Sequence, residues 1–132
     1  SRALDFANRE GVSIKYQTGV IGELLLPANS YDAIALIYVH LPLPLRKEFH
    51  QQFIMSLKPG AVLIMEAFCK EQINNQSGGP KDSNMLYDLS EILEDFKALK
   101  ILKASKEDVF LEEGNFHRGL ADVIRLVLQK EA

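Results

Sequence analysis

The chain has 132 residues, 47% hydrophobic and 25% charged, so one hydrophobic core is expected. Its formal net charge of -3 and scattered basic residues offer no continuous surface for a nucleic acid. A single cysteine excludes an internal disulfide and a cysteine-based metal site, and no apolar run approaches the roughly 20 residues of a membrane helix. Because no export signal is visible either, we expect a cytoplasmic protein that holds no metal and binds neither nucleic acid nor membrane.

The first part of the chain predicts a helix and then a strand. Residues 1–10 carry apolar residues at helical spacing, begin at Ser1, a natural N-cap, and stop at Gly11. Residues 12–17 alternate apolar and polar side chains, which is the pattern of a half-buried strand, and Gly19 then breaks the pattern. Because the helix begins at the first residue, we expect this to be a cut edge of a larger domain.

Two buried strands and a helix are predicted next. Residues 31–39 and 61–68 are almost uniformly apolar, as in parallel strands covered by helices on both faces. Between them, residues 45–57 place apolar side chains on one helical face and His50 on the polar face, where we expect it to be solvated. Glu66 is the polar exception in the second strand, so it either reaches an open sheet edge or has a buried partner.

The last part predicts a lid, a helix and a pair of strands. The polar stretch that follows the second buried strand is too long for a turn, and we predict a substrate lid over residues 70–87. Asp88, followed three residues later by a glutamate, predicts the start of a short helix. Residues 101–111 and 116–128 are strand-like and are separated by a turn of hairpin length.

This order of elements predicts an α/β fold. We expect a Rossmann-like, doubly wound sheet that is mostly parallel and closes with an antiparallel β-hairpin at the C-terminus. We expect that the N-terminal strands of such a sheet are missing from these residues, and no glycine-rich phosphate-binding pattern occurs anywhere in them.

Four stretches of the chain carry a family resemblance, namely SRALDFANREGVSI, NSYDAIALIYVHLPLPLR, LKPGAVLIMEAF and EGNFHRGLADVIRLVLQK. They resemble class I S-adenosylmethionine-dependent methyltransferases, in the subgroup of the tellurite-resistance and thiopurine-methylating enzymes. Their order is that of the family, whose earlier glycine-rich turn and acidic residue have no counterpart here. The resemblance implies that residues 1–132 are the C-terminal two-thirds of a methyltransferase domain, which transfers a methyl group from S-adenosylmethionine to a small-molecule acceptor.

The resemblance also implies the cofactor-binding residues. Gly19 and Val20 correspond to positions beside the adenine ring, where the backbone of Val20 carries over and Gly19 has the alternative role of turning the chain. Ile37 and Tyr38, at the end of the first buried strand, correspond to positions that line the methionine half of the cofactor. Ligands of open α/β sheets lie beyond the carboxyl ends of the parallel strands, which supports this placement.

Two histidines are candidate catalytic residues. His40 follows the same strand and could take a proton from the acceptor, because the ordinary pKa of histidine is close to neutrality. Its alternative is a buried, hydrogen-bonded histidine that holds the proline-rich loop. His117 opens the last strand on the acceptor side, with a hairpin-stabilising role as its alternative. For Glu66 we expect a structural role, with acceptor binding as the alternative.

Two other functions remain open. A nucleotide-dependent oxidoreductase shares this type of sheet, but the closing hairpin and the missing glycine pattern disfavour it. The other alternative is a non-catalytic interaction module, because an incomplete sheet exposes edges that pair with other chains. For this reason we also expect a homodimer that forms through the exposed sheet edges.

Overall fold

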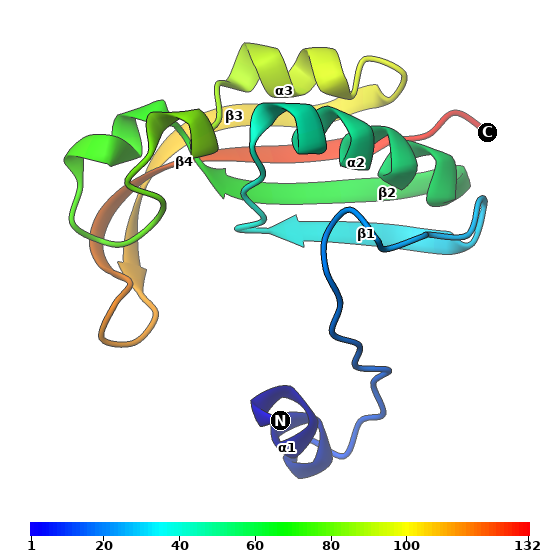
Figure 1. Cartoon of the computed structure of the whole chain (residues 1–132), viewed down its shortest axis with the longest axis horizontal. Helices are drawn as coiled ribbons and strands as arrows, with labels where there is room; N and C mark the ends of the chain where they lie inside the picture. Colours follow the sequence, from blue (N-terminus) through cyan, green and yellow to red (C-terminus); the bar gives the residue numbers. More distant parts are fainter.

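The computed structural model describes all residues from Ser1 to Ala132 (Figure 1). Its elements are α1 (Arg2–Arg9), β1 (Tyr31–Ile37), α2 (Leu43–Ser56), β2 (Leu57–Phe68), the 3-10 helices η1 (Lys70–Asn74) and η2 (Ser83–Met85), α3 (Leu89–Asp95), β3 (Lys100–Glu112) and β4 (Arg118–Gln129). The strands form one four-stranded sheet in the order β1-β2-β4-β3.

The sheet is mixed, and the prediction that it is mostly parallel is wrong. β1 and β2 run parallel, whereas β2 with β4 and β3 with β4 run antiparallel. The reason is the position of the hairpin formed by β3 and β4. Because β4 lies between β2 and β3, it makes both of the antiparallel pairings. In this register Glu66 on β2 lies opposite Ile37 on one side and Arg125 on the other.

Helices α2 and α3 both pack on one face of the sheet (Figure 1), so the doubly wound arrangement is also not observed. Antiparallel strands joined by a tight turn need no crossover helix, and the hairpin therefore brings no helix to the opposite face. The main core lies beneath the two helices and includes Leu63 and Met65 of β2 and Leu126 of β4. On the opposite face Ile37 and Ile64 are 52% and 43% exposed.

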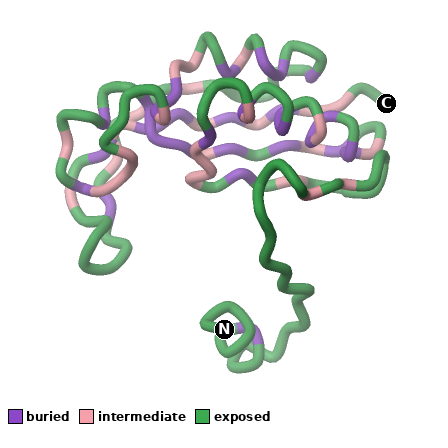
Figure 2. Tube along the Cα trace, in the orientation of Figure 1, coloured by how far each residue is buried: buried purple, intermediate pink, exposed green.

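Residues 12–26, which we call the arm, connect α1 toward β1. Near α1 the arm lies away from the sheet (Figure 1), whereas Leu24 and Leu26 at its other end pack against the main core. The strand predicted for Val12 to Gln17 does not form, because a strand needs a neighbour for its backbone hydrogen bonds and the arm has none. Figure 2 shows most of the arm and most of α1 as exposed, and Ile14 and Tyr16 are 44% and 49% exposed. Alternation of side chains was therefore not sufficient for a strand.

The helix ends agree with the predicted capping residues, whereas the start of β2 differs from its predicted position. The Asp88 carboxylate accepts hydrogen bonds from the backbone N–H groups of Ser90 and Glu91, which confirms it as the N-cap of α3. β2 begins at Leu57, earlier than predicted, so that Gly60 lies inside the strand with a φ of 82°. No helix has the length and apolar composition needed to cross a bilayer.

Candidate functional site

The carboxyl ends of β1 and β2 lie side by side, because these two strands are parallel. Tyr87, which is fully buried, ties the segments that follow them together. Its hydroxyl donates to the carbonyl oxygen of Val39 at 2.9 Å and accepts from the backbone N–H of Leu41 at 2.7 Å. The turn after β1 is thus fixed by a residue from the end of the predicted lid.

Tyr38 is the residue immediately after β1. Its hydroxyl donates to Glu66 Oε1 at 2.6 Å, and its ring lies with a centroid distance of 4.6 Å from the ring of Phe68. Burial, together with this hydrogen bond to a carboxylate, raises the pKa of Tyr38 well above its usual range. The phenol therefore stays neutral near pH 7 and can orient a ligand but cannot serve as a base.

Both carboxylate oxygens of Glu66 have hydrogen-bond partners, as expected for a polar residue in an otherwise apolar strand. Oε1 accepts from Tyr38, and Oε2 accepts from Arg125 Nε at 2.6 Å. Arg125 Nη1 also donates to Glu107 Oε2 at 2.8 Å. The arrangement favours the structural role over the acceptor-binding role, since each carboxylate oxygen already binds a side chain of the protein.

Both ring nitrogens of His40 are engaged. Nδ1 lies 2.7 Å from the carbonyl oxygen of Met85, which can only accept, so Nδ1 carries the proton. Nε2 accepts from the backbone N–H of Phe68 at 3.2 Å. Burial lowers the pKa of His40, which keeps the ring neutral. This geometry matches the alternative role of holding the loops, and the catalytic role of His40 stays a prediction.

His117 lies at the tip of the β3–β4 hairpin and is exposed. Its ring packs against Gly78 of the predicted lid so closely that a methyl group on Gly78 would lie 2.5 Å from the His117 ring. The φ of Gly78 is also 112°, a conformation that only glycine adopts easily. His117 thus joins the hairpin to the lid, and its catalytic role also stays a prediction.

The first half of the predicted lid is docked on β4 by the buried side chain of Gln72. Its Nε2 donates to Ser77 Oγ at 2.9 Å and to the carbonyl oxygen of Gly78 at 3.0 Å. Its Oε1 accepts from Asn75 Nδ2 and from the backbone N–H of Asp122, both at 2.9 Å. No local pattern predicts this role of Gln72, because its partner on β4, Asp122, is 50 residues away.

Gly19 and Val20 lie apart from these residues. With five neighbours they line a pocket of about 330 Å³ formed within the arm: Gln17, Thr18, Ile21, Leu24 and Leu26. Of the residues that line this pocket, Leu24 and Leu26 pack against the main core. The residues predicted from the resemblance therefore fall into three places, namely the arm, the end of β1 with Ile37, Tyr38 and His40, and the hairpin tip with His117.

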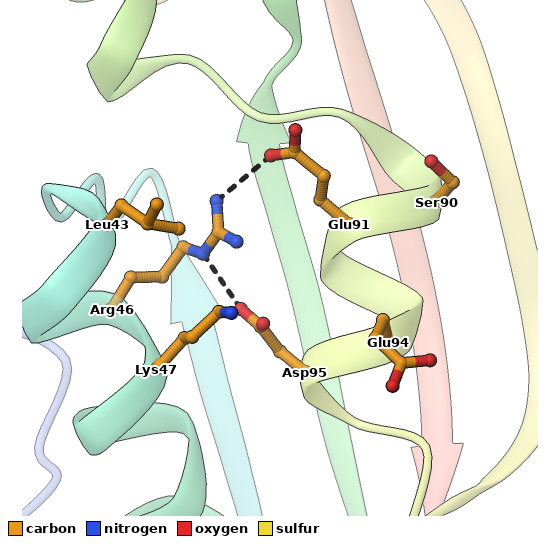
Figure 3. Close-up of a pocket in the computed structure, with 7 residues that line it drawn as sticks. All are labelled: Leu43, Arg46, Lys47, Ser90, Glu91, Glu94 and Asp95. Atoms are coloured by element: carbon orange, nitrogen blue, oxygen red, sulfur yellow. Dashed lines mark hydrogen bonds and ion pairs between the residues drawn. The ribbon is translucent and has the colours of Figure 1, made fainter.

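A further pocket of about 410 Å³ lies between α2 and α3 (Figure 3). Arg46 Nε donates to Asp95 Oδ2 at 2.8 Å, and Arg46 Nη1 lies 3.3 Å from Glu91 Oε2. His50 Nδ1 also lies 2.9 Å from Asp95 Oδ2. The prediction that His50 is solvated is wrong: it is 1% exposed, because α3 packs over this face of α2 and supplies its partner.

His50 should make the protein less stable in acid. Burial first, and then the charge of Arg46, lower the pKa of His50 to about 4, although Asp95 acts in the opposite direction. The unfolded chain binds a proton near pH 6.5 and the folded chain only near pH 4, so the free energy of unfolding falls as the pH drops through this range. We expect a loss of about 2 kcal/mol between pH 7.5 and 5.

Urea unfolding at the two pH values measures this loss. In His50→Asn, which is uncharged at every pH, the difference between the two pH values should shrink by that amount. An unchanged pH dependence in this variant would assign the effect to other groups.

No protein-family model and no curated protein sequence matches the chain. Solved structures do match its mixed α/β fold. TehB from Haemophilus influenzae has a TM-score of 0.74 over 97% of this chain at 14% identity. A SAM-dependent methyltransferase from Methanosarcina mazei has a TM-score of 0.65 over 98% at 16% identity. The N-methyltransferase NodS from Bradyrhizobium japonicum has a TM-score of 0.67 over 99% at 13% identity.

These matches define the fold. The chain spans 45% of TehB, 76% of the M. mazei protein and 69% of NodS. At such low identity the likeness shows only that the chain shares the Rossmann-like α/β fold of these structures.

Proposed function

We propose that this protein takes part in the transfer of a methyl group from S-adenosylmethionine to a small-molecule acceptor. The observation that carries the proposal is the fold shared with methyltransferase structures over nearly the whole chain. The subgroup of tellurite-resistance and thiopurine-methylating enzymes is part of the proposal and rests on the sequence resemblance.

The residues at the end of β1 fit one half of the cofactor. Ile37 is 52% exposed and so offers accessible apolar surface, and beside it the ring of Tyr38 is held in place by Glu66 and Phe68. The apolar pocket with Gly19 and Val20 suits an adenine ring in composition, but in this structure it is separate from Ile37 and Tyr38. Ile37 and Tyr38 therefore fit the methionine half of the cofactor.

The cofactor, when bound, supplies a sulfonium methyl group for in-line transfer. Such a reaction depends mainly on proximity and orientation. Accordingly, the residues at the end of β1 contribute rigidity: Tyr38 and His40 are each hydrogen-bonded to neighbouring strands or loops. His40 and His117 remain the proposed catalytic residues, and for His40 to accept a proton, its bond from the N–H of Phe68 would have to open.

Isothermal titration of S-adenosylhomocysteine into the protein tests this proposal. We expect binding, and we expect Ile37→Asp to weaken it at least about tenfold, because a charge replaces the apolar contact surface. Leu102→Asp is the matched control, since Leu102 is 49% exposed on β3, and it should leave the affinity unchanged. Absence of binding, or equal losses in the two variants, would contradict the proposal.

A second candidate is an interaction module that pairs with a copy of itself. β1 is an edge strand of the sheet, and an edge presents free backbone N–H and C=O groups to another strand. Beside it, Ile37 and Ile64 are exposed on the face that α2 and α3 do not cover. These features support a homodimer formed through β1 and this face.

Sedimentation equilibrium tests the dimer. We expect a dimer at concentrations of about 100 µM, and we expect Ile64→Lys to raise its dissociation constant at least about tenfold, because the charge would be buried in the interface. Lys103→Glu, an exposed change on β3, is the control for altered charge. A monomer at all concentrations would contradict this candidate.

A further inference from the structure

Glu66 holds Tyr38 at two points. The backbone N–H of Tyr38 donates to the carbonyl oxygen of Glu66 at 2.7 Å, and the Tyr38 hydroxyl donates to Glu66 Oε1 at 2.6 Å. The ring between these two bonds lies against Phe68, two residues further along the same strand. One strand therefore fixes the main chain, the ring and the hydroxyl of Tyr38.

Tyr38 needs this support, because its φ of 53° is in the left-handed region. For a bulky residue that conformation is strained and persists only where the surroundings enforce it. The only other such residue in the chain that is not glycine is Asn29. The strained residue is thus the one that turns the chain at the carboxyl end of β1.

Glu66 is itself fixed from the other side. Arg125 on β4 donates to Glu66 Oε2, and Arg125 is held in turn by Glu107 on β3. The chain of charged bonds therefore crosses from the end of β1 through β2 and β4 to β3. Charge-assisted bonds of this kind are short and directional, so they fix the Glu66 carboxylate toward Tyr38.

We propose that Glu66 is a positioning residue, which acts through Tyr38 and presents the Tyr38 ring as a rigid wall of the cofactor site at the end of β1. This inference rests on the proposed function. It assigns to Glu66 neither catalysis nor contact with the acceptor, since both of its carboxylate oxygens bind side chains of neighbouring segments.

A double-mutant cycle tests the inference. The affinity for S-adenosylhomocysteine is measured in the wild type, Glu66→Ala, Tyr38→Phe and the double variant. Each single change should weaken binding about tenfold, and the double variant should be no weaker than the single ones, because Glu66 acts through the Tyr38 hydroxyl. Glu66→Gln should recover part of the affinity, because its amide oxygen still accepts from Tyr38. Glu94→Ala, at an exposed glutamate on α3, should have no effect.

Additive losses, amounting to about a hundredfold in the double variant, would overturn the inference, as would a Glu66→Ala protein with wild-type affinity. Urea midpoints of the same four proteins give a readout that needs no ligand. If the wild type binds no S-adenosylhomocysteine, the proposed function fails. Non-additive midpoints would then still support the hold of Glu66 on Tyr38, and additive midpoints would overturn that hold as well.

Discussion

Asp95→Ala is expected to lower the free energy of unfolding by about 3–5 kcal/mol, the largest effect of any single change considered. Asp95 is the acceptor for Arg46 and the partner of His50, and all three residues are buried. Without the carboxylate, the guanidinium of Arg46 stays buried with only the half-exposed Glu91 beside it. An unpaired buried charge costs far more than the pair contributes.

Chemical denaturation of the wild type and the variant measures this loss. Glu94→Ala is the matched control, because it removes an acidic residue of the same helix whose partner, Lys97, is exposed, and it should change stability by less than about 1 kcal/mol. Arg46→Met combined with Asp95→Leu removes both charges and should recover much of the stability. A loss below about 1 kcal/mol in Asp95→Ala would show that the charges are not shielded from water as the structure indicates.

Tyr87→Phe is expected to cost about 2–4 kcal/mol, although it removes a single oxygen atom. That hydroxyl accepts a hydrogen bond from the N–H of Leu41 and donates one to the carbonyl of Val39, and Tyr87 itself is fully buried. Phenylalanine leaves both groups without a partner, and an unsatisfied buried polar group costs about 1–3 kcal/mol.

The variant should also loosen the turn after β1, since the lost hydroxyl is the group that joins Tyr87 to Val39 and Leu41 of that turn. Hydrogen exchange of the Leu41 amide, together with denaturation, measures both effects. Tyr16→Phe is the control, because Tyr16 is 49% exposed in the arm. Equal stability of the two variants, with unchanged protection of Leu41, would contradict the role of the hydroxyl.

Local patterns predicted most elements of the fold correctly. The apolar runs became β1 and β2, the apolar spacing became α2, and the capping pattern at Asp88 became α3. The segments before and after the hairpin turn pair as β3 and β4. Each of these signals is read from neighbours in the chain, so no knowledge of distant contacts was required.

The predictions that were wrong all depended on contacts with residues that are distant in the sequence. Residues 12–17 have the alternation of a strand but no strand beside them, and pairing is a property of the whole sheet. His50 lies among polar residues of its helix, yet α3 covers it and Asp95, 45 residues away, is its partner. The direction of the sheet pairings depended likewise on where the hairpin inserted.

Local patterns are enough to predict the apolar strands, the helices and the placement of Tyr38 and His40 around the end of β1, because hydrophobic periodicity and turn residues act over short stretches of chain. What these two side chains contact depends on the folded structure. The Tyr38 hydroxyl meets Glu66 from 28 positions away, and the His40 ring meets Met85 from 45. These partners come together only when the sheet and residues 70–87 fold, because each pair joins segments that are far apart in the chain.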